Sequence, residues 1–251
     1  MHKRFTRTAL VALVVTSALI AAPLADGSAA QAAGVPVGNI GKFKQNYLES
    51  FSTAAAANGP FAKTYANSWQ PYPDGMGNGQ YWSGSQISAT GGMMDIALSG
   101  TRGAAGTFGT KNGAWSFVGG KFTVRARAVG GDTNGAAFIL WPTSNNWTEG
   151  EIDYPEANYE TSPMLHQHSM IAGKEDTATS VSTRVSWRDW HTYSVEWIPG
   201  KSVRYLLDDR VIATVTKDVP KTPHRYMFQT GNWGKAGHLY IDWITTYTYQ
   251  P

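Results

Sequence analysis

Short apolar segments, separated by glycine, asparagine and aspartate, make up most of the chain after Gln86. The clearest segment, Lys121–Val129, alternates between apolar and polar residues, which is the period of a β-strand with one buried face. Ala136–Trp141 is instead apolar throughout, as expected of a strand buried on both faces. Short segments with turn residues between them favour an all-β fold of two antiparallel sheets packed face to face.

Further segments predict strands of the same kind: a hairpin over Gln86–Leu98, a strand over His191–Trp197, a hairpin over Val203–Val215 and a closing strand over Leu239–Tyr249. One amphipathic helix is expected, over Asn46–Ala57. No linker composition, charge run or internal repeat divides the chain. Residues 46–251 are therefore predicted to form a single domain, preceded by a flexible lead-in over residues 33–45.

The N-terminal residues have the pattern of a secretory signal peptide. A basic start over residues 2–7 precedes an apolar stretch over 8–25, and Ala30-Gln31-Ala32 supplies a cleavage site. We therefore expect residues 1–32 to be removed and the mature protein to be secreted, extracellular and free of the membrane. The alternative is a retained membrane anchor, for which the apolar stretch is marginal in length and lacks a stop-transfer cluster.

Composition narrows the classes of partner. Without the expected signal peptide, 18 basic and 17 acidic residues remain, and this near-neutral balance argues against a nucleic-acid partner. The chain has no cysteine, which excludes a disulfide framework, a thiolate metal site and a thiol nucleophile. Its 10 tryptophans and 12 tyrosines suit either an ordinary β-core or a surface on which sugar rings stack. We expect the protein to be a monomer.

Trp147–Asn158 carries the acidic residues Glu151, Asp153 and Glu156. Side chains two residues apart on a strand share a face, so Glu151 and Asp153 point the same way, whereas Glu156 falls on the opposite face of a regular strand. One extra residue in a β-bulge at Tyr154-Pro155 returns Glu156 to the face of the other two. Proline is tolerated in a bulge because it has no N–H to donate to the ladder.

Three carboxyl groups on one face suit acid–base chemistry on a sugar. Retaining glycoside hydrolysis uses a carboxylate nucleophile and a carboxylic acid about 5 to 5.5 Å apart, and crowded carboxylates keep one of their number protonated. The alternatives are a solvent-facing acidic strand edge and a calcium site built from the same oxygens. The flanking Trp141 and Trp147 favour the sugar site, because aromatic rings stack on sugar rings.

These residues resemble the signature of glycoside hydrolase family 16, the laminarinase-like β-jelly-roll enzymes. The family's bulged Glu-x-Asp-x-x-Glu pattern stands here as Glu151-Ile-Asp153-Tyr-Pro-Glu156, and the resemblance covers essentially the whole mature chain. Looser matches to family strands and to a loop of actinobacterial members lie at Gly120–Arg127, His191–Trp197, Asp242–Tyr247 and Trp69–Asp74.

The resemblance implies a concanavalin-like sandwich with a concave substrate cleft. It also implies retaining hydrolysis of internal β-linkages in a polysaccharide, with Glu151 as nucleophile, Glu156 as general acid/base and Asp153 tuning both. The expected substrate is β-1,3-glucan or β-1,3/1,4-glucan. The alternatives are a galactan or anionic-polysaccharide hydrolase of the same family, a transglycosylase that shares the covalent intermediate, and a lectin-like sandwich that binds glycans without cleaving them.

Substrate-binding candidates are drawn from aromatic, amide and charged side chains: Trp141, Trp147, His168, Arg125, Asn232 and Trp233. Aromatic faces bind the apolar side of sugar rings, and an amide supplies hydrogen bonds that fix orientation. The resemblance suggests that His168 lies beside the acid/base. A packed loop anchor is the alternative for Trp233, and an ion pair with a carboxylate is the alternative for Arg125.

No cofactor is expected to be required. His166 and His168 have the spacing of two metal ligands on one strand face, but no third ligand with matching context accompanies them. The resemblance makes Asp242 a candidate ligand for a structural calcium ion on the outer face of a sheet.

Overall fold

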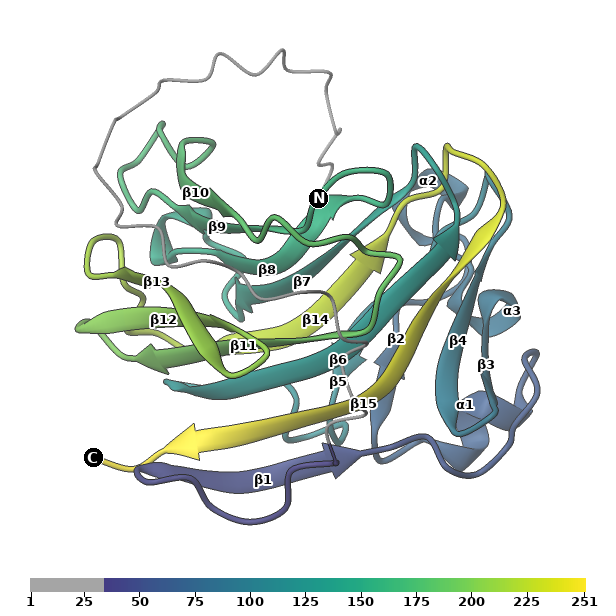
Figure 1. Ribbon diagram of the computed structural model, residues 1–251, viewed down its shortest axis with the longest axis horizontal. Helices are drawn as coiled ribbons and strands as arrows, with labels where there is room; N and C mark the ends of the chain where they lie inside the picture. Colours follow the sequence, from purple (N-terminus) through teal and green to yellow (C-terminus); the bar gives the residue numbers. More distant parts are fainter. Residues whose placement is uncertain (1–33) are drawn as a thin grey trace, which may run out of the picture. The chain divides into compact units, whose positions relative to one another are not determined.

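Two antiparallel β-sheets lie one over the other in the computed structural model, which describes residues 34–251 (Figure 1). The fold is thus the antiparallel sandwich that the strand patterns predicted. Val35–Pro251 forms one compact unit. The predicted signal peptide, residues 1–32, lies outside the described residues.

Within the described residues the larger sheet has eight strands in the order β13-β12-β11-β6-β15-β4-β3, and β1 also pairs with β15. Their bounds are β1 Phe43–Glu49, β3 Ile87–Thr90, β4 Met93–Leu98, β6 Gly120–Gly130, β11 His191–Ile198, β12 Ser202–Leu207, β13 Arg210–Val215 and β15 Gly237–Tyr249. The other sheet has seven strands in the order β10-β9-β8-β7-β14-β5-β2. Their bounds are β2 Trp69–Pro71, β5 Ala105–Phe108, β7 Gly135–Pro142, β8 Ile152–Asn158, β9 Met164–His168, β10 Ala178–Ser182 and β14 His224–Thr230.

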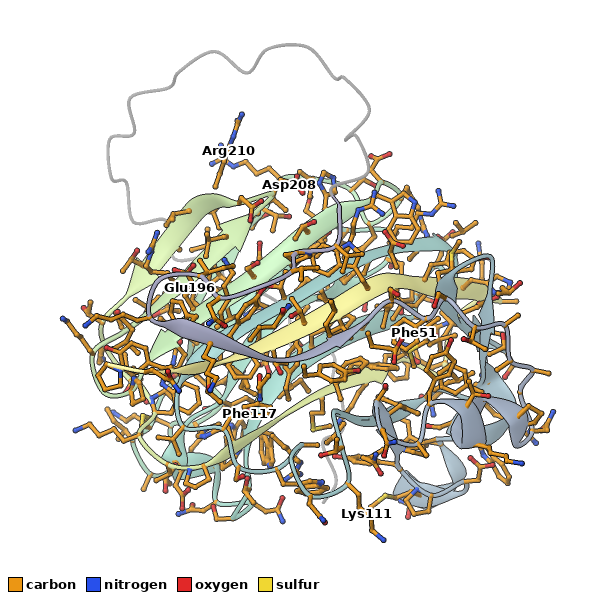
Figure 2. All side chains as sticks on the ribbon, turned by 90° about the horizontal axis from the view of Figure 1, so that it is seen from below. Phe51, Lys111, Phe117, Glu196, Asp208 and Arg210 are labelled. Carbon is orange, nitrogen blue, oxygen red and sulfur yellow. The ribbon has the colours of Figure 1, made fainter. Side chains whose placement is uncertain are left out.

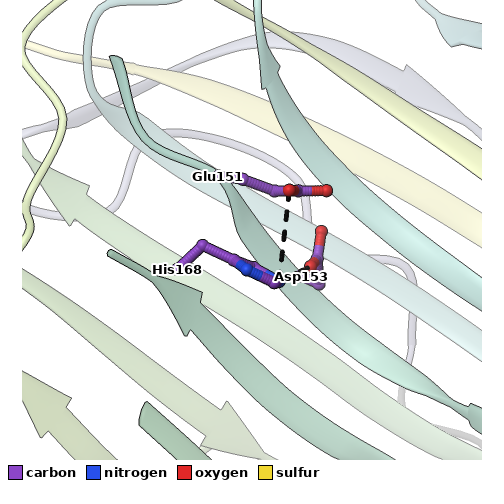
Figure 3. A group of neighbouring side chains, drawn as sticks. All are labelled: Glu151, Asp153 and His168. Atoms are coloured by element: carbon purple, nitrogen blue, oxygen red, sulfur yellow. Dashed lines mark ion pairs between the residues drawn. The ribbon is translucent and has the colours of Figure 1, made fainter. Parts of the chain in front are cut away.

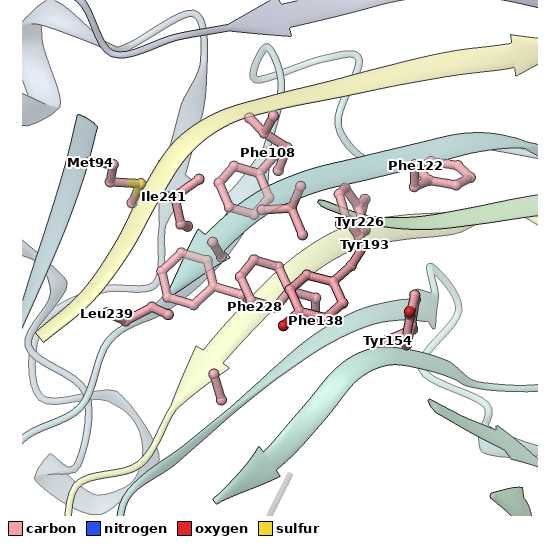
Figure 4. Close-up of a cluster of buried hydrophobic side chains, with 14 of the residues drawn as sticks. Met94, Phe108, Phe122, Phe138, Tyr154, Tyr193, Tyr226, Phe228, Leu239 and Ile241 are labelled. Atoms are coloured by element: carbon pink, nitrogen blue, oxygen red, sulfur yellow. The ribbon is translucent and has the colours of Figure 1, made fainter. Parts of the chain in front are cut away.

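The main apolar core fills the space between the sheets. On β6 the alternation predicted from the sequence is confirmed, because Phe122, Val124, Ala126 and Ala128 are all buried in this core. Aromatic rings from the facing sheet, among them Phe108, Phe138 and Phe228, pack into the same cluster (Figure 4). Burying these side chains is the main favourable contribution to holding the sheets together.

Both predicted hairpins form. Gly91 and Gly92 connect β3 to β4 with φ of 59° and 76°, a backbone that glycine adopts without steric cost. Asp208 and Asp209 connect β12 to β13 with φ of 47° and 63°. Arg210, which follows them, projects away from the sheets (Figure 2).

The helix expected over Asn46–Ala57 is wrong. Phe43–Glu49 is instead strand β1, whose residues pair with Ile244–Tyr249 of β15. This strand also begins inside the expected flexible lead-in over residues 33–45. Pairing with a long neighbouring strand outweighs a weak local helical pattern, because sheet context rather than intrinsic propensity decides such segments.

The helices among the described residues are short: α1 Pro60–Thr64, α2 Met76–Gly79, α3 Ser83–Gln86 and the 3₁₀ turn η1 Trp147–Glu149. None of the helices in residues 34–251 is long and apolar enough to cross a membrane.

A second apolar cluster marks the side of the seven-stranded sheet that faces away from the core. It consists of Ala137, Ile139, Trp141 and Met227, with Tyr72 and Trp147 packed against it. We call this side of the sheet the open face.

Candidate active site

Strand β8 carries the predicted β-bulge. Asp153 pairs with Ile139 of β7 and Glu156 pairs with Ala137, so three steps on β8 match two steps on β7. The same mismatch recurs against β9. Because Ile139 and Ala137 belong to the open-face cluster, Asp153 and Glu156 both lie on the open face. The predicted placement of Glu156 beside Asp153 is confirmed.

The bulge residue Tyr154 anchors this part of β8 to the core. Tyr154 points into the core, where it is 1% exposed, and its hydroxyl donates a hydrogen bond to the Leu206 carbonyl oxygen across the sandwich at 3.1 Å. Pro155 follows through a cis peptide bond. Tyr154 and Pro155 together are the two residues that stand between Asp153 and Glu156.

Glu151 lies immediately before β8, and contacts on both sides of it fix its backbone. Its own carbonyl oxygen accepts the His168 N–H at 3.0 Å. The carbonyl of the preceding Gly150 lies 3.0 Å from Nε2 of His224, a fully buried side chain. Gly150 has φ of 100°, and a Cβ there would lie 2.7 Å from Pro220, so only glycine fits this turn.

His168 connects two of the three carboxylates. Its Nε2 lies 3.0 Å from Oδ2 of Asp153 and 4.0 Å from Oε2 of Glu151 (Figure 3). Its Nδ1 donates to the Glu175 carbonyl oxygen at 2.8 Å. Burial disfavours a charged imidazole, but the hydrogen bond to Asp153 and the charges of Asp153 and Glu151 outweigh it and raise the pKa of His168 to about 9. The ring is therefore an imidazolium at neutral pH.

Glu156 differs from His168 in that its neutral form is the one that its surroundings favour. Burial, together with the negative charges of Asp153 and Glu151 and a hydrogen bond with Asp153, raises the pKa of Glu156 well above its usual range. The carboxylate site thus contains one carboxyl group whose protonated form is favoured, next to carboxylates that face a cation. This separation of roles is the arrangement that acid–base chemistry on a sugar requires.

Aromatic rings border the carboxylates on the open face. The Trp141 and Trp147 rings lie 6.3 Å apart, and the Trp147 ring lies 5.7 Å from the imidazole of His168. The structure therefore brings both tryptophans and His168 to the predicted site. Trp141 is 4% exposed, so most of its ring packs in the open-face cluster.

Asn232 and Trp233 lie in the loop after β14. The last residue of β14, Thr230, pairs with Ala136 of β7, and the neighbouring Ala137 pairs with Glu156. The Asn232 amide nitrogen donates to the Gln80 carbonyl oxygen at 3.2 Å. Trp233 is 49% exposed, and its backbone N–H donates to Asn134. The loop is thus held at the Glu156 end of the site with one indole exposed.

The assignment of Arg125 to substrate binding is wrong. Arg125 lies on β6 of the eight-stranded sheet, with its side chain on the face opposite the core. There its Nη1 lies 2.5 Å from Oδ2 of Asp242, and its guanidinium stacks on Trp190 at 4.7 Å. The ion pair that the sequence left as the alternative is the one that forms. Asp242, the candidate calcium ligand, thus carries an ion pair on its Oδ2.

In the part of the chain that the structure describes, one set of three side chains offers ligand atoms within 4.8 Å of one another: Glu151, Asp153 and His168. Within this set, Nε2 of His168 forms an ion pair with Oδ2 of Asp153 at 3.0 Å.

Several open-face residues were not identified from the sequence. Strand β14 places Arg225, Met227 and Gln229 there, and the Tyr81 hydroxyl donates to Gln229 at 3.0 Å. His166, which the sequence placed on one strand face with His168, also lies there, opposite Asp153, with its Nδ1 2.7 Å from the Ser180 hydroxyl. The alternation over residues 225–229 was the available signal, but the apolar Met227 in the middle conceals it.

Comparison with known proteins identifies the family. Residues 77–245 match the model for glycosyl hydrolases family 16. A probable xyloglucan endotransglucosylase/hydrolase protein of Nicotiana tabacum is 29% identical over 200 residues, which are 73% of this chain and 61% of that protein. The chain thus spans less than two thirds of the length of this relative.

Solved structures share the fold at low sequence identity. The laminarinase from Rhodothermus marinus superposes with a TM-score of 0.62 at 17% identity, over 83% of this chain and 98% of that one. The endo-β-1,3-glucanase from Pyrococcus furiosus superposes with a TM-score of 0.65 at 14% identity, over 85% of this chain and 97% of that one. Because the family model spans well over half of the residues, the chain belongs to family 16 of the glycosyl hydrolases.

Proposed function

We propose that this chain is a secreted, retaining endo-β-glycosidase that hydrolyses internal linkages of β-1,3-glucan or β-1,3/1,4-glucan. The observation that carries the proposal is the bulged strand β8, which puts Glu151, Asp153 and Glu156 on one face with His168 against two of them. A glycan-binding sandwich without catalysis has no need of a protonated carboxyl group beside two carboxylates.

Two carboxyl groups take the two halves of the reaction. Glu151 attacks the anomeric carbon and forms a covalent glycosyl-enzyme, while Glu156 donates its proton to the departing glycosidic oxygen. Glu156 suits this step because its raised pKa favours its protonated form. The resulting Glu156 carboxylate then takes a proton from water, which attacks the intermediate and restores the original configuration.

Asp153 and His168 hold the charges in place between these steps. The His168 imidazolium donates to Asp153 at 3.0 Å and faces Glu151 at 4.0 Å, so it attracts the negative charge of both. Asp153 in turn shares a hydrogen bond with Glu156. This network favours the proton on Glu156 and the negative charge on Glu151.

The substrate is the finer part of the proposal. Its support is the likeness to the laminarinase and the endo-β-1,3-glucanase named above, together with the tryptophans beside the carboxylates. The relative from Nicotiana tabacum is named as both a transglucosylase and a hydrolase, and a sugar hydroxyl can replace water in the second step.

The test is incubation with laminarin, mixed-linkage β-glucan, xyloglucan, agarose and carrageenan, followed by reducing-end and product-length analysis. The expected result is new reducing ends with a rapid fall in chain length on laminarin or mixed-linkage glucan, and none with Glu151→Ala. Cleavage of agarose or carrageenan alone would contradict the substrate, and binding without cleavage of any glycan would contradict the enzyme. Products longer than the substrate would identify a transglycosylase.

A further inference from the structure

Trp115 is a large aromatic side chain that the site described above does not include. It lies in the loop between β5 and β6 and is 36% exposed. The guanidinium carbon of Arg225 lies 4.7 Å from the centre of its ring. Trp115 is therefore a half-exposed indole that rests on a buried cation.

The cation under Trp115 is fixed in place. Arg225 is 6% exposed, and it donates from Nη1 to the Pro142 carbonyl oxygen at 3.2 Å and from Nη2 to Oδ1 of Asn145 at 3.0 Å. The indole N–H of Trp141 donates to the same Asn145 oxygen at 3.2 Å. One asparagine thus ties the support of Trp115 to the ring of Trp141.

The loop that carries Trp115 is also anchored. Phe117 and His224 exchange two backbone hydrogen bonds, of 2.9 and 2.8 Å. Strand β5 pairs only with Met227–Gln229 of β14, so the loop continues the sheet beside the start of β14. The Thr143 hydroxyl donates to the Trp115 carbonyl oxygen. A ring held at its backbone and supported from below is preorganised for binding, because little conformational freedom remains to be lost.

Trp115 continues a row of residues that begins at the carboxylates. Arg225 pairs with Trp141, and Trp141 lies one strand away from the start of β8, beside Glu151. Adjacent strands are ~4.8 Å apart, so Arg225 is roughly 10 Å from Glu151 across the open face. A sugar ring over Trp115 therefore does not border the bond that Glu151 attacks.

We propose that Trp115, supported by Arg225, is a stacking platform for a distal, uncharged sugar unit of the polysaccharide, a subsite reached only by longer substrates. The inference rests on the proposed glycanase function. A neutral sugar is favoured because the Nη1 and Nη2 atoms of Arg225 are directed at protein oxygens and its Nε is buried, so the cation acts as a support and not as an anion site.

Chain-length dependence separates this platform from a merely structural tryptophan. Trp115→Ala is compared with wild type on a series of gluco-oligosaccharides of increasing length and on the polymer. The expected loss in kcat/KM is roughly 3- to 10-fold on the polymer, carried by KM, and shrinks toward none as the substrate shortens, since an aromatic stacking contact is worth about that factor. Trp115→Phe should keep most of the activity on long substrates.

Trp190 provides a matched control. Its ring also stacks on arginine, with Arg125 at 4.7 Å and Arg127 at 5.0 Å, but it lies on the outer side of the other sheet. Trp190→Ala removes the same kind of stacking contact, and any change it causes in kcat/KM should be the same on short and long substrates. Thermal unfolding of both variants checks that they are folded.

The outcomes distinguish the two proposals. A wild-type enzyme that cleaves no member of the glycan panel would overturn the proposed function and this subsite with it. Active wild type, combined with a Trp115→Ala loss that is equal on short and long substrates or matched by Trp190→Ala, would overturn the subsite alone. Stronger length dependence on a sulfated or uronate polymer than on glucan would overturn the neutral sugar.

Discussion

The Nε2 atom of His168 lies 3.0 Å from Oδ2 of Asp153, and this contact sets the charge of the candidate site. His168 comes from β9 and Asp153 from β8, so the ion pair forms only when these two strands are correctly aligned. The same imidazole faces Glu151 at 4.0 Å. Folding and the protonation of the site are consequently linked.

This link predicts a pH dependence of stability. The pKa of His168 is about 9 in the folded protein against 6.5 for an unperturbed histidine, so its contribution is complete below pH 6.5 and disappears as the pH rises through about 9. The contribution is at most about 3.5 kcal/mol. Urea unfolding should therefore show wild type losing more stability than His168→Gln between pH 6 and pH 9.5. Parallel losses in the two proteins would contradict the imidazolium.

The raised pKa of Glu156 predicts the shape of the activity profile. Because this residue acts as an acid in its protonated form, kcat/KM on polysaccharide should fall as the pH rises through its pKa. In Glu156→Ala that alkaline fall should be absent on aryl glycosides whose leaving groups need no proton. Rates measured from pH 4 to 10 test this, and an unchanged alkaline fall in the variant would assign it to another group.

His224 is predicted to position Glu151 through the backbone. Its Nε2 and Nδ1 lie 3.0 and 2.8 Å from the carbonyl oxygens of Gly150 and Thr222, inside the core. His224→Phe should lower the free energy of unfolding by about 1 to 3 kcal/mol and reduce kcat more than it changes KM. His224→Gln should recover part of both, because its amide nitrogen reaches toward the position of Nε2.

The control for that substitution is His238→Phe. His238 pairs with Asp95 on the eight-stranded sheet, and its side chain is 42% exposed, so its loss should change stability by less than about 1 kcal/mol and leave kcat unchanged. If His224→Phe behaves like His238→Phe, the contact with Gly150 has no positioning role.

The proposed secretion predicts a defined mature N-terminus. The basic start, apolar stretch and Ala30-Gln31-Ala32 place cleavage so that the mature chain begins between residues 26 and 34. N-terminal sequencing of protein from the culture medium measures this directly. Recovery of the intact chain in a membrane fraction would instead indicate a retained anchor.

The sequence predicted strands wherever one face of a strand is clearly apolar. Lys121–Val129 is an example, since its polar side faces outward on β6. His224–Thr230 was missed because the apolar Met227 interrupts the polar side of its alternation, so the segment shows neither a clear period of two nor a continuous apolar run. Strand Phe43–Glu49 was missed, and was divided between the expected lead-in and the expected helix, because its pairing with β15 is contributed by residues roughly 200 positions away.

The candidate site likewise contains features that the local sequence predicts and features that it does not. The bulge was predictable because only an extra residue brings Glu156 to the face of Glu151, a local geometric requirement. The error at Arg125 has a different origin, because period two assigns a side chain to a face of its strand but does not say which sheet the strand joins. Trp115 and Arg225 reach the open face through a loop and a concealed strand, which no local pattern indicates.

Glu151 is proposed as the nucleophile and Glu156 as the acid/base. Each alanine variant should lose roughly 10²- to 10⁴-fold or more on polysaccharide, and circular dichroism confirms that the variants are folded. Adding azide to each variant with an activated aryl β-glycoside should restore turnover. The two rescues differ in stereochemistry, because one proceeds by a single displacement and the other by two.

The most direct measurement is the anomeric configuration, by NMR, of the glycosyl azide that each variant forms. In Glu151→Ala, azide takes the place of the missing nucleophile and should give the inverted α-glycosyl azide. In Glu156→Ala, azide intercepts the intermediate on Glu151 and should give the β-glycosyl azide. The β-product from Glu151→Ala and the α-product from Glu156→Ala would show that Glu156 is the nucleophile and Glu151 the acid/base.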